Sequence, residues 1–139
     1  MLKSENARYT VSTSEDNGQS WSAFVTAGTV PDAVGFTKPS FEYSREGILG
    51  LMWRAVYSDR TYDIWAAVSR DGGKTFSKSL RVSHARSPGI DVYRNAGLFG
   101  DDIQDLSMDR ENLHLVWGDS RSGFQGVWYG RVRLADFEF

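Results

Sequence analysis

The 139-residue sequence contains no cysteine, two histidines and three prolines. Without cysteine, the chain can form neither disulfides nor thiolate-ligated metal sites. His84 and His114 are far apart in the sequence and lack the spacing of paired metal ligands. No calcium-binding loop, zinc-protease helix motif or phosphate-binding loop is present. We therefore expect neither a metal site nor a cofactor.

The chain also lacks an excess of positive charge and any long apolar run. Its formal net charge is −2, which does not favour nucleic acid as a partner. The longest apolar stretch, around Ile48 to Trp53, is far shorter than a membrane span. The N-terminal stretch M1-L-K-S-E-N-A-R-Y-T10 lacks the apolar segment of a signal peptide. We expect no membrane contact, and these features leave the cellular compartment unknown.

The residues that are present predict a packed β protein. Hydrophobic residues make up 40% of the chain and aromatic residues 14%, which is typical of a folded domain. No segment has a sustained helical period. Short alternating runs bounded by Gly, Asp, Ser and Asn recur instead, which is the pattern of β-strands. Three such rows are Leu49, Leu51 and Trp53; Ile64, Ala66 and Val68; and Leu113, Leu115 and Trp117.

One motif, Ser-x-Asp-x-Gly-x-(Ser/Thr)-(Trp/Phe), occurs twice, as S14-E-D-N-G-Q-S-W21 and as S69-R-D-G-G-K-T-F76. Its glycine tolerates positive φ, and its aspartate and first serine can bond to the backbone within a tight turn. We expect the aromatic ring to start the next strand and fold into the core, contributing about 1.5–3 kcal/mol. We interpret these residues as structural rather than catalytic or metal-binding: Ser14, Asp16, Gly18, Trp21, Ser69, Asp71, Gly73 and Phe76.

A second similarity indicates a repeated unit. E46-G-I-L-G-L-M-W53 resembles R110-E-N-L-H-L-V-W117, and each is followed by an Asp-containing turn and another strand with a tryptophan. One complete unit is predicted over 38–83, preceded by the end of a unit at 7–27 and followed by the start of one at 101–134. The strands expected in the complete unit are 38–44, 48–57, 61–69 and 76–83. Loops are expected around 28–37 and 84–99.

The two motifs resemble the Asp-box, or bacterial neuraminidase repeat, of sialidase-like β-propellers. In that family the box lies in the turn between the third and fourth strands of a blade, on the outer rim and away from the active centre. G100-D-D-I-Q-D-L-S-M-D109, with L113-H-L-V-W-G-D-S-R121 after it, also resembles the blade-opening strands of bacterial members. The resemblance implies antiparallel four-stranded blades, about two to two and a half in this chain. After Y129-G-R-V-R-L134 the sequence departs from the pattern, because no third box follows.

An incomplete propeller raises the question of closure, because open sheet edges invite pairing. The chain could be a fragment of a longer propeller, could assemble with copies of itself, or could form a compact sandwich from the same strands. Our hypothesis for self-assembly is a trimeric ring in which a neighbour's N-terminal hairpin completes the C-terminal blade. In that ring, either 7–13 or 123–134 must lie outside the ring or replace the other, because one strand more is expected than two blades need.

The resemblance directs attention to arginines and acidic residues. Sialidases bind a substrate carboxylate with an arginine cluster and use a Tyr–Glu nucleophile pair with an aspartate as acid/base. Guanidinium groups bind carboxylates bidentately, so Arg54, Arg94 and Arg121 are candidate anion contacts, with solvated arginines as the alternative. Asp101 and Asp102 lie near the channel-facing strand in the resemblance. A polar channel rim is favoured for them over a metal or acid–base site.

Aromatic residues supply the remaining candidates. Trp65 and Trp128 could stack on sugar rings, with core packing as the alternative. The resemblance and these residues favour a non-catalytic propeller module that binds a ligand, carbohydrate above all. The first alternative is part of a sialidase or related glycoside hydrolase whose catalytic residues lie elsewhere or are assembled between chains, because no complete catalytic set can be assigned here. The second is a scaffold without ligand. Family members lead us to consider an extracellular or periplasmic location.

Overall fold

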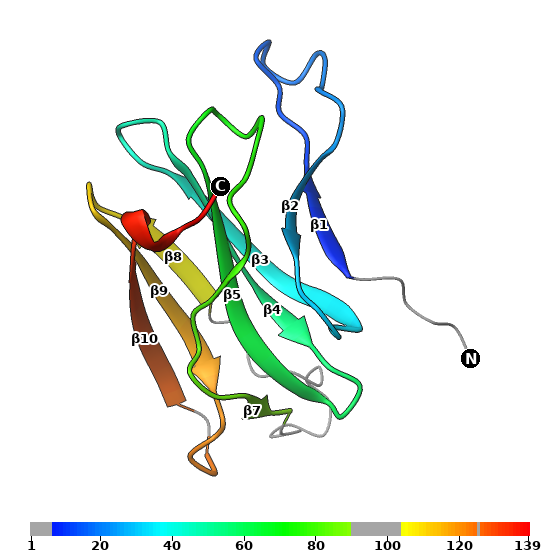
Figure 1. Ribbon diagram of the computed structural model, residues 1–139, viewed down its shortest axis with the longest axis vertical. Helices are drawn as coiled ribbons and strands as arrows, with labels where there is room; N and C mark the ends of the chain where they lie inside the picture. Colours follow the sequence, from blue (N-terminus) through cyan, green and yellow to red (C-terminus); the bar gives the residue numbers. More distant parts are fainter. Residues whose placement is uncertain (1–6, 90–103, 125) are drawn as a thin grey trace.

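The computed structural model describes residues 7–89, 104–124 and 126–139. These residues form an all-β structure in which every pair of neighbouring strands is antiparallel, as the alternating pattern predicts. Three sheets result, which we call the N-terminal, central and C-terminal sheets (Figure 1). The N-terminal sheet contains β1 (Arg8–Val11) and β2 (Val25–Thr29).

The central sheet is the largest and has the strand order β3-β4-β5-β6, with β7 also paired to β5. The C-terminal sheet has the order β10-β9-β8 and is followed by the short 3-10 helix η1. The bounds are β3 (Gly35–Tyr43), β4 (Leu49–Val56), β5 (Thr61–Ser69), β6 (Leu80–Arg81), β7 (Ser87–Pro88), β8 (Gln104–Met108), β9 (Asn112–Asp119), β10 (Gly126–Arg133) and η1 (Leu134–Asp136).

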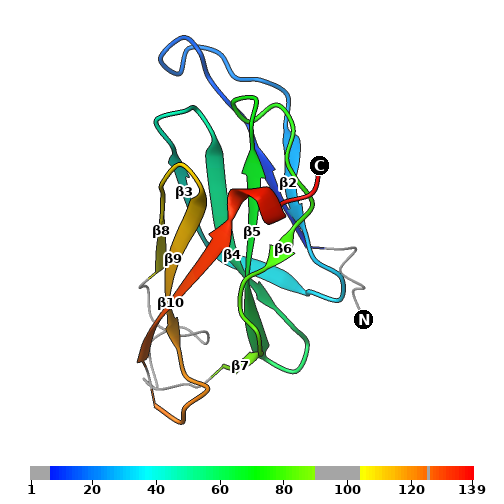
Figure 2. The same ribbon diagram turned by 60° about the vertical axis from the view of Figure 1, so that its left-hand side comes forward.

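The sheets are layered with the central sheet in the middle, and Figure 2 shows this arrangement from the side. Every residue of β4 is buried, because this strand is covered on both faces. Met52 and Val56 contribute to a core shared with the C-terminal sheet. Leu51, Trp53 and Ala55 contribute to a second core shared with the N-terminal sheet. Successive side chains of β4 therefore enter two different cores, one on each face of the strand.

The repeated unit recognised in the sequence has a structural counterpart. Trp53 pairs with Trp65 across β4 and β5, and Trp117 pairs with Trp128 across β9 and β10. Each of these two strand pairs is joined by a turn, and each is preceded by one further antiparallel strand, β3 or β8. The first three strands of the two units are therefore equivalent in order and direction.

The last strand of the central unit differs from the prediction. A single strand was expected over 76–83, but only Leu80–Arg81 forms one, and the separate Ser87–Pro88 pairs farther along β5. The Ser77 and Ser83 hydroxyls accept bonds from the backbone N–H groups of Val68 and Ile64, at 3.0 Å in both cases. Side-chain oxygens thus take the place of strand carbonyls, so the segment follows β5 without keeping a regular ladder.

Candidate functional site

The two turns with the Ser-x-Asp-x-Gly motif form self-contained hydrogen-bonded corners. In the second corner, Asp71 accepts bonds from the Ser69 hydroxyl at 2.8 Å and from the Thr75 backbone N–H and hydroxyl at 2.9 and 2.6 Å. The Ser69 hydroxyl also accepts the Gly73 N–H at 2.8 Å. This corner joins β5 to the segment that contains β6, which are neighbouring strands of one sheet.

The first corner repeats this network between β1 and β2. Asp16 accepts bonds from the Ser14 hydroxyl at 2.8 Å and from the Ser20 backbone N–H and hydroxyl at 2.9 and 2.6 Å. Gly18 and Gly73 have φ values of 84° and 92°, the positive φ expected of the motif glycine. In both corners the preceding residue also has positive φ, which the sequence reading did not anticipate.

The expected aromatic plug is present in only one corner. Phe76 is partly buried and packs against the core between the N-terminal and central sheets. The prediction for Trp21 was wrong, because its side chain is 65% exposed. Neither ring starts a strand, since β2 begins at Val25 and β6 at Leu80. Among the described strands β1 pairs with β2 alone, and the Trp21 ring is left uncovered, so burial of the motif's aromatic ring depends on more than the local motif.

The corner aspartates are held as carboxylates. Hydrogen bonds from the hydroxyl and backbone N–H of Ser20, and from Ser14, lower the pKa of Asp16 to about 2. The equivalent bonds from Thr75 and Ser69 lower the pKa of Asp71 to about 2. Because these oxygens are engaged in bonds that shape the turn, the geometry agrees with a structural role for both residues.

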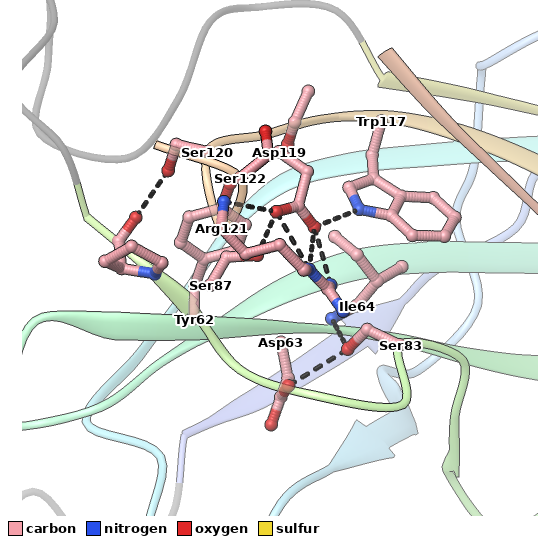
Figure 3. Close-up of polar contacts among 12 residues, drawn as sticks. Tyr62, Asp63, Ile64, Ser83, Ser87, Trp117, Asp119, Ser120, Arg121 and Ser122 are labelled. Atoms are coloured by element: carbon pink, nitrogen blue, oxygen red, sulfur yellow. Dashed lines mark hydrogen bonds and ion pairs between the residues drawn. The ribbon is translucent and has the colours of Figure 1, made fainter. Parts of the chain in front are cut away.

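A buried polar cluster lies at the opposite end of the sheets from these two corners, around the turn that follows β9 (Figures 1 and 3). Asp119 is fully buried at its centre. It accepts bonds from the Ser87 hydroxyl at 2.5 Å, the Trp117 ring N–H at 3.0 Å and the Arg121 guanidinium at 2.6 Å. Burial on its own raises the pKa of Asp119, but the bonds from Arg121, Ser87 and Trp117 outweigh this effect and lower it to about 2.

A second buried carboxylate, Asp63 of β5, lies near this cluster. It accepts bonds from Arg81 at 2.8 Å and from the Ser83 hydroxyl at 2.9 Å, and Arg86 is 3.6 Å away. The Arg86 guanidinium also lies over the Tyr57 ring, 3.6 Å from its centroid. These contacts anchor the segment between β6 and β7 to the edge of the central sheet.

The structure brings together three of the residues singled out in the sequence. Arg54 is completely buried, bonds to the Gly118 carbonyl at 3.4 Å and lies 5.2 Å from the centroid of the Tyr62 ring. The alternative of a solvated strand arginine was therefore wrong for Arg54. The Arg121 guanidinium pairs with Asp119 and lies 4.6 Å from the centroid of the Trp128 ring.

The remaining candidates are not part of this group. Trp65 packs against the core on the other face of the central sheet, next to the N-terminal sheet. Arg94, Asp101 and Asp102 lie outside the described residues. Sequence reasoning missed Asp119 and Ser87, although G118-D-S-R121 had been noted as a turn. An aspartate two residues before an arginine was a possible signal, but burial of the pair depends on β7, which the sequence did not predict.

The third nitrogen of the Arg121 guanidinium is buried. Its Nε and Nη2 bond to Asp119, whereas Nη1 has no hydrogen-bond partner among the described residues. Beside it, the Trp128 ring centroid is 6.5 Å from that of His84, whose side chain is exposed. A guanidinium, an aromatic face and an imidazole therefore lie together where the chain leaves the central sheet.

A groove of a different character opens beside β1, with a volume of about 610 Å³. None of its lining residues is charged, and Trp21, Phe41 and Tyr43 expose aromatic surface there. We call it the β1 groove. It is lined by Tyr9, Thr10, Val11, Ser12, Thr13, Ser14, Trp21, Pro39, Phe41, Tyr43, Leu49 and Leu51.

Comparison with protein-family models, curated proteins and solved structures found no match for this chain. Within residues 7–89, 104–124 and 126–139, no group of histidine and acidic side chains is arranged to hold a metal ion. No helix in that part of the chain has the length and apolar character needed to cross a bilayer. The description of the site therefore depends on its own geometry.

Proposed function

We propose that this chain is a segment of a sialidase-like Asp-box β-propeller and acts as a non-catalytic binding module for carbohydrate. The matched pair of corners carries this proposal. Asp16 and Asp71 make the same bonds in the same order, each between the last two strands of an antiparallel unit. The face-to-face layering of successive units, each contributing one sheet, also supports a propeller segment.

The polar end of the sheets is the better of the two surfaces for an acidic sugar. Arg121 is held in place by the buried Asp119, and its side chain keeps 13% exposure at this end of the sheets. A guanidinium on a fixed support binds a carboxylate with little loss of side-chain freedom. The exposed His84, whose ring lies beside the partly buried Trp128, adds a ring surface on which a pyranose can stack. We therefore propose a glycan with a carboxylate group as the ligand class at this end.

A glycan array with Arg121→Lys and Arg131→Lys tests the proposal. Arg131 is an exposed residue of β10 and provides a matched control. We expect the unchanged chain and Arg131→Lys to bind acidic glycans, and Arg121→Lys to bind them at least about tenfold more weakly because lysine lacks the planar fork. Thermal melting checks that both variants fold. Silence across all sugars, or equal binding by the two variants, would contradict the proposed site. Turnover of a fluorogenic sialoside would contradict the non-catalytic role.

A further inference from the structure

Three side chains of the C-terminal sheet form a hydrogen-bonded row at the end where β9 begins. His114 lies at its centre, with Nε2 2.9 Å from Asp109 Oδ2 and Nδ1 2.8 Å from the Tyr129 hydroxyl. The imidazole and phenol rings are stacked, with centroids 6.1 Å apart and planes inclined by 18°. Arg121 follows the other end of β9, so the row is separate from the polar end of the sheets.

The alternation of the two strands brings the rings together. Leu113 and Leu115 enter the core shared with the central sheet, so His114 between them lies on the opposite, outer face of β9. Tyr129 of β10 is paired with Val116, the next residue of β9 on that face. Its ring is therefore diagonal to His114, a position from which an aromatic side chain can reach its neighbour.

The third member, Asp109, fixes the proton of the imidazole. Its Oδ1 accepts the backbone N–H groups of Glu111 and Asn112 at 2.8 and 2.7 Å. The bond from His114 and these two backbone bonds hold the pKa of Asp109 well below its usual range. An ionised carboxylate can only accept, so a neutral His114 carries its proton on Nε2. Nδ1 is then an acceptor, and the Tyr129 hydroxyl donates to it.

This order of groups is that of a nucleophile, its base and the residue that orients the base. The bond of 2.8 Å between Tyr129 and His114 is within the reach of proton transfer. Tyr129 is 60% exposed, so a reagent in solution can meet it. We propose that Tyr129 is a nucleophilic tyrosine that takes an acyl group from a small activated ester, with His114 as general base and Asp109 as a positioning residue.

The proposed step transfers one acyl group and one proton. The Tyr129 oxygen forms a bond to the acyl carbon while its proton passes to Nδ1 of His114. The bond between the acyl carbon and the leaving oxygen then breaks, and the leaving group departs with the electron pair and takes up the proton. The product is an aryl ester, so the donor must itself be at least as reactive, such as an aryl ester or an anhydride. An alkyl ester is therefore not a donor.

The probe is p-nitrophenyl acetate, and a second tyrosine provides an internal control. Tyr43 is 48% exposed, and its hydroxyl donates to the Gly72 carbonyl at 3.5 Å, which is not a base. After brief exposure, mass spectrometry of peptides measures the acetyl content of Tyr129 and Tyr43. Phenylmethanesulfonyl fluoride is applied in parallel. It reacts in the same way at sulfur with release of fluoride, and its tyrosine product resists hydrolysis, so loss of label does not conceal the reaction.

We expect both reagents to label Tyr129 at least about tenfold faster than Tyr43, because general-base assistance contributes about 10²–10⁴-fold. His114→Gln should lower the labelling of Tyr129 to about that of Tyr43, and thermal melting checks that this variant folds. Equal labelling of the two tyrosines, or labelling of Tyr129 that His114→Gln leaves unchanged, overturns the proposal. Label found on His114 instead of Tyr129 overturns it as well.

Nitrogen NMR shifts of the His114 ring test the role of Asp109. We expect the neutral ring to carry its proton on Nε2. In Asp109→Asn the amide oxygen remains toward the backbone N–H groups that Oδ1 accepts, so the amide NH₂ takes the place of Oδ2 and donates to Nε2. The proton then moves to Nδ1, and labelling of Tyr129 should fall. A fall in labelling with the Nε2 proton unchanged overturns the positioning role. None of these residues belongs to the polar end, so every outcome is independent of acidic-glycan binding.

Discussion

Replacing Gly28 with alanine tests whether the N-terminal sheet packs on the central sheet as described. A Cβ at Gly28 of β2 would lie 2.5 Å from Cη2 and 2.6 Å from Cζ2 of Trp53. Carbon atoms in ordinary contact are about 3.5–4.0 Å apart, so the methyl group and the ring would overlap by about 1 Å. Trp53 is fully buried, and the ring centroids of Tyr9 and Phe36 are 6.1 and 5.5 Å from its own, so it has little room to move.

The size of the effect follows from this overlap. Overpacking a core costs about 1–3 kcal/mol, and an overlap with a rigid ring belongs at the upper end, about 2–3 kcal/mol. In a chain of this length, 1 kcal/mol changes Tm by about 3–4 °C. We therefore expect Gly28→Ala to lower Tm by about 6–12 °C.

Thermal melting followed by circular dichroism measures this change against a matched glycine. A Cβ on Gly35 of β3 meets nothing within 4 Å, so Gly35→Ala should change stability by less than about 0.5 kcal/mol. Combining Gly28→Ala with Trp53→Leu removes most of the overlapping ring, and the cost of the alanine should then shrink because the two sites are coupled. If Gly28→Ala melts at the temperature of Gly35→Ala, the two sheets do not pack in this way.

Three further predictions concern the corners and the polar end. The pKa values of Asp71 and Asp119 in the folded state are lowered to about 2. The stability that these two charges contribute is therefore present above about pH 4 and is lost as the pH falls toward 2. We expect Tm to be level near neutrality and to fall between about pH 4 and pH 2. Asp119→Asn should destabilise the fold by about 3 kcal/mol in urea unfolding, because it leaves the Arg121 guanidinium buried beside a neutral group; a change under about 0.5 kcal/mol would show that the pair contributes little. Trp21→Ala should change stability by less than about 0.5 kcal/mol, whereas Phe76→Ala should cost about 1–2 kcal/mol, and equal effects in the two melts would contradict the difference in burial.

The parts of the fold that could be predicted are those fixed by neighbouring residues. Every partner of Asp71 in its corner lies within four positions along the chain, so the motif contains all of its own geometry. The positions of β4 and β5 could be predicted for the same reason, because the alternating residues lie within each strand. The all-β class follows from these two signals together.

The polar end could not be predicted because its partners are distant in the sequence. Arg54 is buried by contacts with Gly118 and Tyr62, and nothing beside it in the sequence distinguishes it from an exposed arginine. Asp119 meets Ser87 from a strand of two residues, too short to give an alternating pattern. Burial of charge depends here on the packing of three separate strands, so only the folded arrangement reveals it.

The two corners allow local and tertiary contributions to be separated. The bonds of the first serine and those from the Ser or Thr four positions after the aspartate match in position and length, yet the ring that follows each corner is exposed in one case and packed in the other. If ring burial shaped the corner, the corner that precedes Trp21 would differ from the one that precedes Phe76. Since it does not, the serine, aspartate and glycine set the turn, and the aromatic residue is available for whatever lies beside it. At the first corner Trp21 lines the β1 groove, so the aromatic ring of the motif is exposed there, whereas Phe76 packs against the core at the second corner.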